Sequence, residues 1–222
     1  MSGLTIPTPH GPAEAELHYC SRPGAELPFR ASAEPPFGAL LLGHGAGGAT
    51  SAPDLMATTR AATASGMHVA LVSQPYRVAG RRAPAPARQL DEAWLAVAGY
   101  LADGVFADLP LVFGGRSSGA RVACRTAAAG GAVAVLCLAF PVHPPGRPDR
   151  DRMPELDAVV VPVLVVQGER DRFGRPEPAA AREVVLLPGD HSLTADSAAV
   201  ERAVAQWLQR LEGMRAPAGA LI

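Results

Sequence analysis

Short apolar runs alternate along the chain with longer segments whose hydrophobic residues recur at helical spacing. Glycine, proline or polar residues bound the apolar runs, as is usual for short buried strands. Strands are predicted at residues 37–43, 68–73, 109–113, 133–140, 161–167 and 183–187. Helices are predicted between and after them, at 53–65, 88–103, 118–129, around 177–182 and at about 196–212. This alternation implies an α/β fold with a mainly parallel sheet between layers of helices.

The two ends of the chain add smaller features to this pattern. Segments at about 4–8 and 14–20 predict an antiparallel hairpin at one sheet edge, with its turn at residues 10–12. Gly213 is suited to end the last helix, whose apolar face is formed by Val200, Val204, Trp207, Leu208 and Leu211. The late connection at 141–157 is long, but no linker or repeat appears. We predict one domain over residues 1–213 and a flexible tail at 214–222.

The pentapeptide Gly115-Arg116-Ser117-Ser118-Gly119 lies between the strand predicted at 109–113 and the next helix. Gly-x-Ser-x-Gly at a strand-to-helix turn is the nucleophile elbow of α/β-hydrolases. Its serine sits on a strained turn, and side chains at the flanking glycines would clash with the neighbouring strand and helix. Ser117 is therefore the predicted nucleophile. Arg116 beside it is either a contact for an anionic substrate or the structural partner of a nearby acid.

A carboxylate and a histidine follow in the order that such an enzyme requires. Asp171 comes just after the strand at 161–167, and His191 just after the strand at 183–187. The chain order is thus Ser–Asp–His, with all members at the carboxyl ends of predicted strands. His191 would exchange the Ser117 proton, and Asp171 would orient the imidazole. Asp149 and Asp151, in the loop after the preceding strand, remain rival acids.

The segment 43–48, Gly-His-Gly-Ala-Gly-Gly, follows the first predicted parallel strand and is suited to form an oxyanion hole. Two backbone N–H donors are expected there, from Ala46 and from Ser118, the residue after the nucleophile. His44 is expected to shape this loop. The candidate substrate contacts are His44, Arg116, and His143 in the 141–157 loop. The same segment matches Gly-x-Gly-x-x-Gly, but no carboxylate ends the next strand to bind a ribose, which disfavours a dinucleotide site.

Composition narrows the function classes. The 222 residues are 48% hydrophobic and 18% charged with a net charge of −1, so no basic face favours nucleic acid. No signal-peptide pattern and no apolar stretch of ~20 residues occurs, which predicts a soluble, cytoplasmic protein without membrane contact. No Cys/His pairing has metal-ligand spacing. We expect no metal or cofactor, and a small-molecule acyl substrate as the partner; the oligomeric state is left open.

Five segments, at 42–48, 74–77, 114–121, 140–146 and 167–174, together resemble the dienelactone-hydrolase-like α/β-hydrolases. That family includes bacterial α/β-fold hydrolases and the hydrolase-like domain of a eukaryotic histone-acetyltransferase complex subunit. The resemblance spans about residues 37–211. It implies an α/β-hydrolase fold with a sheet of about 7–8 strands, a minimal lid or none, and Ser117, Asp171 and His191 at the triad positions.

The chain departs from the family pattern at Ser118, Ala120 and Arg172, none of which is a triad member. Dienelactone hydrolases themselves carry a cysteine nucleophile, so Ser117 does not support that substrate. The function we expect is a serine hydrolase that cleaves a carboxylic ester or thioester through an acyl-enzyme. Two alternatives remain open: a non-catalytic interaction module with this fold, and an acyltransferase or perhydrolase using the same triad.

Overall fold

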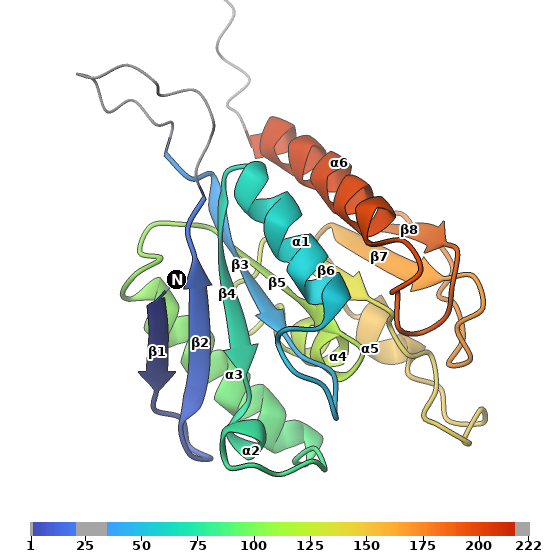
Figure 1. Ribbon diagram of the computed structural model, residues 1–222, viewed down its shortest axis with the longest axis horizontal. Helices are drawn as coiled ribbons and strands as arrows, with labels where there is room; N and C mark the ends of the chain where they lie inside the picture. Colours follow the sequence, from blue (N-terminus) through green and yellow to red (C-terminus); the bar gives the residue numbers. More distant parts are fainter. Residues whose placement is uncertain (1, 21–34, 216–222) are drawn as a thin grey trace, which may run out of the picture.

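In the computed structural model, residues 2–20 and 35–215 are described, and an eight-stranded sheet runs through the molecule (Figure 1). The strand order is β1-β2-β4-β3-β5-β6-β7-β8. The strands are β1 (Ser2–Ile6), β2 (Ala13–His18), β3 (Gly38–Gly43), β4 (Met67–Ser73), β5 (Leu111–Arg116), β6 (Ala134–Leu138), β7 (Val163–Gly168) and β8 (Arg182–Leu187). From β3 to β8 the neighbours pair in parallel, whereas β2 runs antiparallel to both β1 and β4. The mainly parallel sheet and the edge hairpin are confirmed.

Helices cover both faces of this sheet (Figure 1). They are α1 (Pro53–Ala64), α2 (Pro75–Val78), α3 (Ala87–Ala102), α4 (Ser118–Thr126), α5 (Met153–Asp157) and α6 (Ser197–Arg215). On one face α1 packs against α6, and on the other α4 packs against α3 and α5. Across the part of the chain that the structure describes, no helix combines the length and the hydropathy needed to span a bilayer.

The side chains of the central strands divide between two cores, one on each face of the sheet. In β3, Leu40 and Leu42 pack beneath α1 and α6, whereas Ala39 and Leu41 belong to the core beneath α3 and α4. All four side chains are fully buried. Residues alternate between the faces of a strand, so a strand covered by helices on both sides is apolar throughout. This explains why the central strands are continuous hydrophobic runs in the sequence.

Several predicted elements differ from the structure. The helix predicted around 177–182 is wrong: Ala179 forms a bridge with Arg182, where β8 begins. Pro176 and Pro178 disfavour helical backbone before them and remove N–H donors, and the alanines that follow are too few to nucleate a helix. The short helices α2 and α5 were not predicted, and α5 lies inside the expected 141–157 loop.

The end of the chain also differs from expectation. Helix α6 continues through Gly213 to Arg215, so Gly213 does not end it. The apolar face predicted for this helix is confirmed by the burial of Val200, Val204, Trp207, Leu208 and Leu211. The rest of the predicted tail, 216–222, lies outside the described residues. The single domain over 1–213 and the flexibility of 214–222 stay predictions.

The turn from β5 to α4 is packed directly against the end of β3. A Cβ added at Gly119 would lie 2.3 Å from the Gly43 carbonyl oxygen, and one added at Gly115 would lie 2.6 Å from the same atom. Carbon and oxygen atoms that are not bonded cannot approach so closely without displacing backbone. Glycine at these two positions therefore lets α4 begin against the sheet, and this fixes the place of the intervening Ser117.

We expect Gly119→Ala to lower the free energy of unfolding by about 1–3 kcal/mol, because the new methyl group must push α4 away from β3. Urea denaturation would measure this loss. Gly99→Ala is the matched control, because Gly99 lies exposed in α3 with open space around a Cβ. That change should stabilise the protein by up to about 1 kcal/mol through helix propensity. Equal stability of the two variants would contradict this account of the turn.

Candidate active site

Ser117 occupies a strained turn between β5 and α4. Its backbone has φ 53° and ψ −105°, a conformation that residues other than glycine rarely adopt. Its N–H donates to the Leu138 carbonyl at the end of β6, at 2.9 Å, which anchors the turn. The strained backbone thus holds the serine at the carboxyl edge of the sheet, as the Gly-x-Ser-x-Gly pattern predicts.

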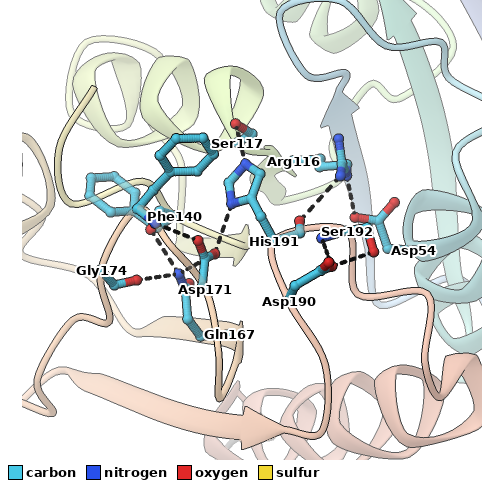
Figure 2. A network of polar contacts seen from close by, with 11 residues as sticks. Asp54, Arg116, Ser117, Phe140, Gln167, Asp171, Gly174, Asp190, His191 and Ser192 are labelled. Carbon is cyan, nitrogen blue, oxygen red and sulfur yellow. Dashed lines mark hydrogen bonds and ion pairs between the residues drawn. The ribbon is translucent and has the colours of Figure 1, made fainter. Parts of the chain in front are cut away.

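His191 lies between Ser117 and Asp171 (Figure 2). Its Nε2 is 2.9 Å from Ser117 Oγ, and its Nδ1 is 2.7 Å from Asp171 Oδ2. An ionised carboxylate accepts hydrogen bonds, so Nδ1 carries the proton and Nε2 is free to accept from the serine hydroxyl. The Asp171 side chain is fully buried. The three predicted triad residues therefore form one continuous chain of hydrogen bonds.

The loops that carry Asp171 and His191 touch each other directly. A Cβ added at Gly168, the last residue of β7, would lie 2.3 Å from the Asp190 carbonyl oxygen. Beyond it, Glu169 N–H donates to the Leu187 carbonyl and Arg170 N–H to the Gly189 carbonyl, both at 2.9 Å. These backbone contacts continue the pairing of β7 with β8 past the sheet edge and bring the acid and the histidine together.

The two rival acids of the sequence analysis, and Asp190 next to His191 in the chain, have other contacts. Asp149 is 71% exposed and lies 3.8 Å from Arg147, and Asp151 accepts the Met153 N–H at the start of α5. Asp190 accepts from the backbone and hydroxyl of Ser192 (Figure 2). Of these carboxylates and Asp171, it is Asp171 that lies within hydrogen-bond distance of the His191 imidazole.

Gln167, in β7, is a functional candidate that the sequence analysis missed. Its Nε2 lies 2.8 Å from Asp171 Oδ2, 3.0 Å from the Phe140 carbonyl and 2.9 Å from the Gly174 carbonyl (Figure 2). An amide nitrogen has two hydrogens for these three acceptors, so one hydrogen is shared. The sequence signal that could have identified it is a single polar residue in an otherwise apolar strand. The fully buried Gln167 amide fixes the carboxylate that orients His191.

Phe173 completes the surroundings of the acid and the imidazole. Its N–H donates to Asp171 Oδ1 at 2.8 Å, so each carboxylate oxygen has a donor. The phenyl ring meets the His191 imidazole edge-on, with 4.5 Å between ring centroids. Aromatic contact of this kind restricts rotation of the imidazole, which keeps Nε2 directed at Ser117.

Arg116 connects the nucleophile turn to two other parts of the site. Its Nε donates to Asp54 Oδ2 at 2.8 Å and its Nη2 to the His191 carbonyl at 3.2 Å (Figure 2). Asp54 is fully buried in the first turn of α1; burial raises the pKa of this carboxyl and the Arg116 charge opposes that rise. Arg116 is thus the structural partner of an acid that sequence reasoning did not identify.

His44 sets the conformation of the loop after β3. The Gln74 N–H donates to its Nε2 at 3.1 Å, so the proton is on Nδ1, which donates to the Gly45 carbonyl at 2.8 Å. The Gly48 N–H also donates to that carbonyl, at 3.1 Å. In a trans peptide the N–H points opposite to the carbonyl, so these bonds direct the Ala46 N–H away from His44. Burial lowers the pKa of His44 and keeps it neutral.

Tyr76, at the start of α2, supports the same loop from its other side. Its hydroxyl donates to the Ala46 carbonyl at 2.7 Å, and burial raises the pKa of Tyr76 to about 12, so the hydroxyl stays protonated. The carbonyls on both sides of Ala46 therefore have side-chain donors. Such support keeps the expected oxyanion loop in one conformation.

A cleft of about 640 Å³ opens above Ser117 and His191. Its lining includes Arg116 but neither of the other tentative substrate contacts, His44 and His143. The lining residues are Gly45, Ala46, Gly47, Gly48, Pro84, Arg116, Ser117, Ser118, Arg121, Pro141, Pro145, Arg152, Phe173 and His191. Within the described segments, no cluster of three His, Cys, Asp or Glu side chains could hold a metal ion.

Comparison with known proteins agrees with this architecture. A family model described as "Alpha/beta hydrolase domain" matches residues 37–212. A Xanthomonas campestris α/β serine hydrolase described as lacking a lid superposes with a TM-score of 0.73 at 21% identity, covering 95% of this chain and 94% of that one. A dienelactone hydrolase from Anabaena variabilis gives a TM-score of 0.69 at 15% identity, covering 94% and 96%.

The esterase domain of a Rhodothermus marinus protein also superposes, with a TM-score of 0.64 at 17% identity, covering 94% of this chain and 98% of that one. No curated protein matches the sequence. At these identities the structural likeness concerns the fold, and the expected fold class with a minimal lid or none is confirmed.

The lowered pKa of His44 predicts a pH-dependent stability. Below about pH 6.5, His44 is protonated in the unfolded chain but stays neutral in the folded protein. The stability that this residue contributes above that pH is therefore lost as the pH falls through its folded-state pKa. The stability advantage of the wild type over His44→Gln should shrink as the pH falls below about 6.5, measured by urea denaturation. Gln206→Met, an exposed change in α6 that removes no titratable group, should follow the wild type. Parallel curves for His44→Gln and wild type would contradict a neutral, buried His44.

Proposed function

The chain belongs to the alpha/beta hydrolase domain family, and we propose that it acts as a serine hydrolase that cleaves a carboxylic ester or thioester. The observation that carries this proposal is the continuous Ser117–His191–Asp171 hydrogen-bond chain, with contacts of 2.9 and 2.7 Å, at the floor of an open cleft. Nothing in this chemistry requires a metal or an organic cofactor.

Acylation begins when a substrate carbonyl enters the cleft above Ser117. As Ser117 Oγ attacks the carbonyl carbon, His191 Nε2 takes the hydroxyl proton, and buried Asp171 stabilises the imidazolium that forms. The carbonyl oxygen, on which negative charge develops, accepts hydrogen bonds from the backbone N–H groups of Ala46 and Ser118. His191 then gives its proton to the departing alkoxide or thiolate, which leaves an acyl group on Ser117.

Deacylation repeats these steps with water. His191 removes a proton from a water molecule that attacks the acyl carbon, the same donors stabilise the oxyanion, and the proton returns to Ser117 as the acid leaves. If an alcohol or a peroxide took the place of water, the same acyl-enzyme would give acyl transfer. That choice depends on what the open cleft admits, and hydrolysis is the reaction we propose.

Two features support the oxyanion role. Ser118 is the first residue of α4, where backbone N–H groups have no acceptor within the helix. Ala46 belongs to a loop whose carbonyls accept from His44 and Tyr76, so its N–H is oriented before any substrate binds. Donors that are fixed in advance contribute most to stabilising a charged transition state.

Labelling by a fluorophosphonate probe tests the nucleophile directly. We expect the wild type to be labelled and the Ser117→Ala and His191→Ala variants to remain unlabelled, because the probe requires an activated serine. Hydrolysis of p-nitrophenyl acetate should fall in Asp171→Asn by up to about 10⁴-fold in kcat. Asp190→Asn is the control that should retain activity, because the Asp190 carboxylate contacts Ser192 and not the imidazole.

The absence of labelling in folded wild-type protein would overturn the proposed hydrolase. The non-catalytic interaction module would then be the better account of this fold, because a fold does not by itself imply chemistry. Retained labelling in Ser117→Ala would instead show that another nucleophile reacts. The small-molecule acyl substrate, the cytoplasmic location and the absence of nucleic-acid or membrane contact stay predictions.

Gln167 is expected to act as a positioning residue through Asp171. Gln167→Met keeps the volume but removes the donor to the carboxylate, so kcat should fall by about tenfold, as expected for one hydrogen bond to a charged group. KM for p-nitrophenyl acetate should stay within about twofold, since the amide is buried away from the cleft. Gln206→Met, on the exposed face of α6, is the control. A change in KM with unchanged kcat would contradict a role through the triad.

A further inference from the structure

The charged residues that line the cleft are all cationic. Arg116, Arg121 and Arg152 contribute to its surface, and no aspartate or glutamate is among the described residues that line it. The remaining lining consists of Ser117 and His191 at the floor, Ser118, the glycine-rich loop, and apolar side chains from Pro84, Pro141, Pro145 and Phe173. The cleft therefore offers positive charge to whatever occupies it.

Two of these arginines are neutralised by carboxylates of the protein. Arg116 pairs with the buried Asp54. Arg121 donates from Nε and Nη2 to the two oxygens of Glu155, at 2.8 and 2.5 Å. Both guanidinium groups therefore already hold an anionic partner, and neither is free to supply a full charge to a substrate.

Glu155 and Asp91, the carboxylates in the cluster that includes Arg152, are paired with other arginines. Glu155 accepts from Arg125 at 3.1 Å in addition to Arg121, and Arg125 donates twice to Asp91, at 2.9 and 2.6 Å. Arg121 and Arg125 thus occupy both carboxylates, Asp91 and Glu155, whereas Glu155 acts on Arg152 only through its charge. Counted as three arginines and two carboxylates, the cluster has one positive charge in excess, and Arg152 is the arginine that neither carboxylate pairs with.

Arg152 has no ion pair and no side-chain hydrogen bond among the described residues. Burial and the charges of Arg121 and Arg125 lower the pKa of Arg152, and Glu155 offsets part of this effect. The neighbouring Asp151 accepts the Met153 N–H at the start of α5 instead. A half-buried arginine without a counter-ion is unusual, because burying an unpaired charge is costly.

The backbone around Arg152 is nevertheless well fixed. Its N–H donates to the Val142 carbonyl at 2.8 Å, which ties the two ends of the 142–152 loop together. It directly precedes α5, whose Glu155 is held by two arginines. The guanidinium is therefore attached to a fixed position on the wall of the cleft and does not depend on a loose surface loop.

We propose that the substrate carries a negatively charged group, a carboxylate or a phosphate, and that Arg152 binds it. This inference rests on the proposed function and adds the substrate class: an acyl compound with an anionic group some distance from the scissile bond. A guanidinium presents paired N–H donors that match the two oxygens of such groups. The proline and phenylalanine side chains would enclose the apolar part between the anion and the reacting carbonyl.

Two matched pairs of substrates test the proposal and separate the two sources of charge. Mono-4-nitrophenyl succinate and 4-nitrophenyl butyrate differ by a carboxylate on the acyl side. S-butyryl-4′-phosphopantetheine and S-butyryl-pantetheine differ by one phosphate on the leaving group. Each of the four substrates is assayed with wild type, Arg152→Gln, Arg152→Lys and Arg147→Gln. Arg147→Gln is the control, because Arg147 is an exposed arginine of the same loop that does not line the cleft.

For at least one pair, Arg152→Gln should lower kcat/KM for the charged member by about ten- to hundredfold, as expected for losing a charge-assisted hydrogen bond. The neutral member should change by less than about twofold, and Arg152→Lys should recover part of the loss. Arg147→Gln should match the wild type on all four substrates. Equal losses on charged and neutral members, or no loss on either charged substrate, would overturn the role of Arg152.

A binding measurement makes the result independent of catalysis. Chemical-shift titrations with glutarate and with inorganic phosphate are run on wild type and Arg152→Gln, and saturable binding should weaken in the variant. If the wild type cleaves neutral esters but shows no charge preference and binds neither anion, the inference fails while the proposed function stands. If no substrate is cleaved, the proposed function fails, and loss of anion binding in Arg152→Gln still supports the anion site.

Discussion

The contact between α4 and the end of β3 is the constraint on which the rest of the site depends. Gly119 lies so close to the Gly43 carbonyl that no side chain fits between them. Because α4 begins there, the chain must turn sharply after Arg116, and Ser117 takes up its positive φ. The same contact places the first N–H groups of α4 beside the glycine-rich loop that follows β3. One close approach of backbone thus positions both the nucleophile and its expected oxyanion donors.

Around this turn, polar groups are buried in a series in which each orients the next. Gln167 and the backbone of Phe173 hold Asp171, which holds His191, which in turn reaches Ser117. On the opposite side Arg116 joins the buried Asp54 to the His191 carbonyl. Burying such groups is unfavourable unless each has a partner, so the paired arrangement also fixes their geometry. The charge of Arg152 stands outside this pattern, because no carboxylate in the described parts of the chain forms an ion pair with it.

Sequence reasoning was accurate where one local rule dominated. The central strands are buried on both faces and are therefore continuous apolar runs, which made their positions predictable within a few residues. It failed for the helix expected around 177–182, where Pro176 and Pro178 disfavour helical backbone and remove N–H donors. It also missed α2 and α5, because helices this short have too few residues for a hydrophobic period to be visible.

By itself the sequence determined the α/β architecture and predicted Ser117, Asp171 and His191 as the reacting groups, because spacing and chain order relative to strands are one-dimensional properties. Which acid faces His191 was left open among Asp149, Asp151 and Asp171, and the fold decided it by pairing β7 with β8 and bringing their loops together. The tertiary structure also decided that Arg116 is paired with Asp54, whereas Arg152 has no ion pair within residues 2–20 and 35–215. Pairing of charges depends on distances between residues far apart in the chain, and no local pattern encodes those distances.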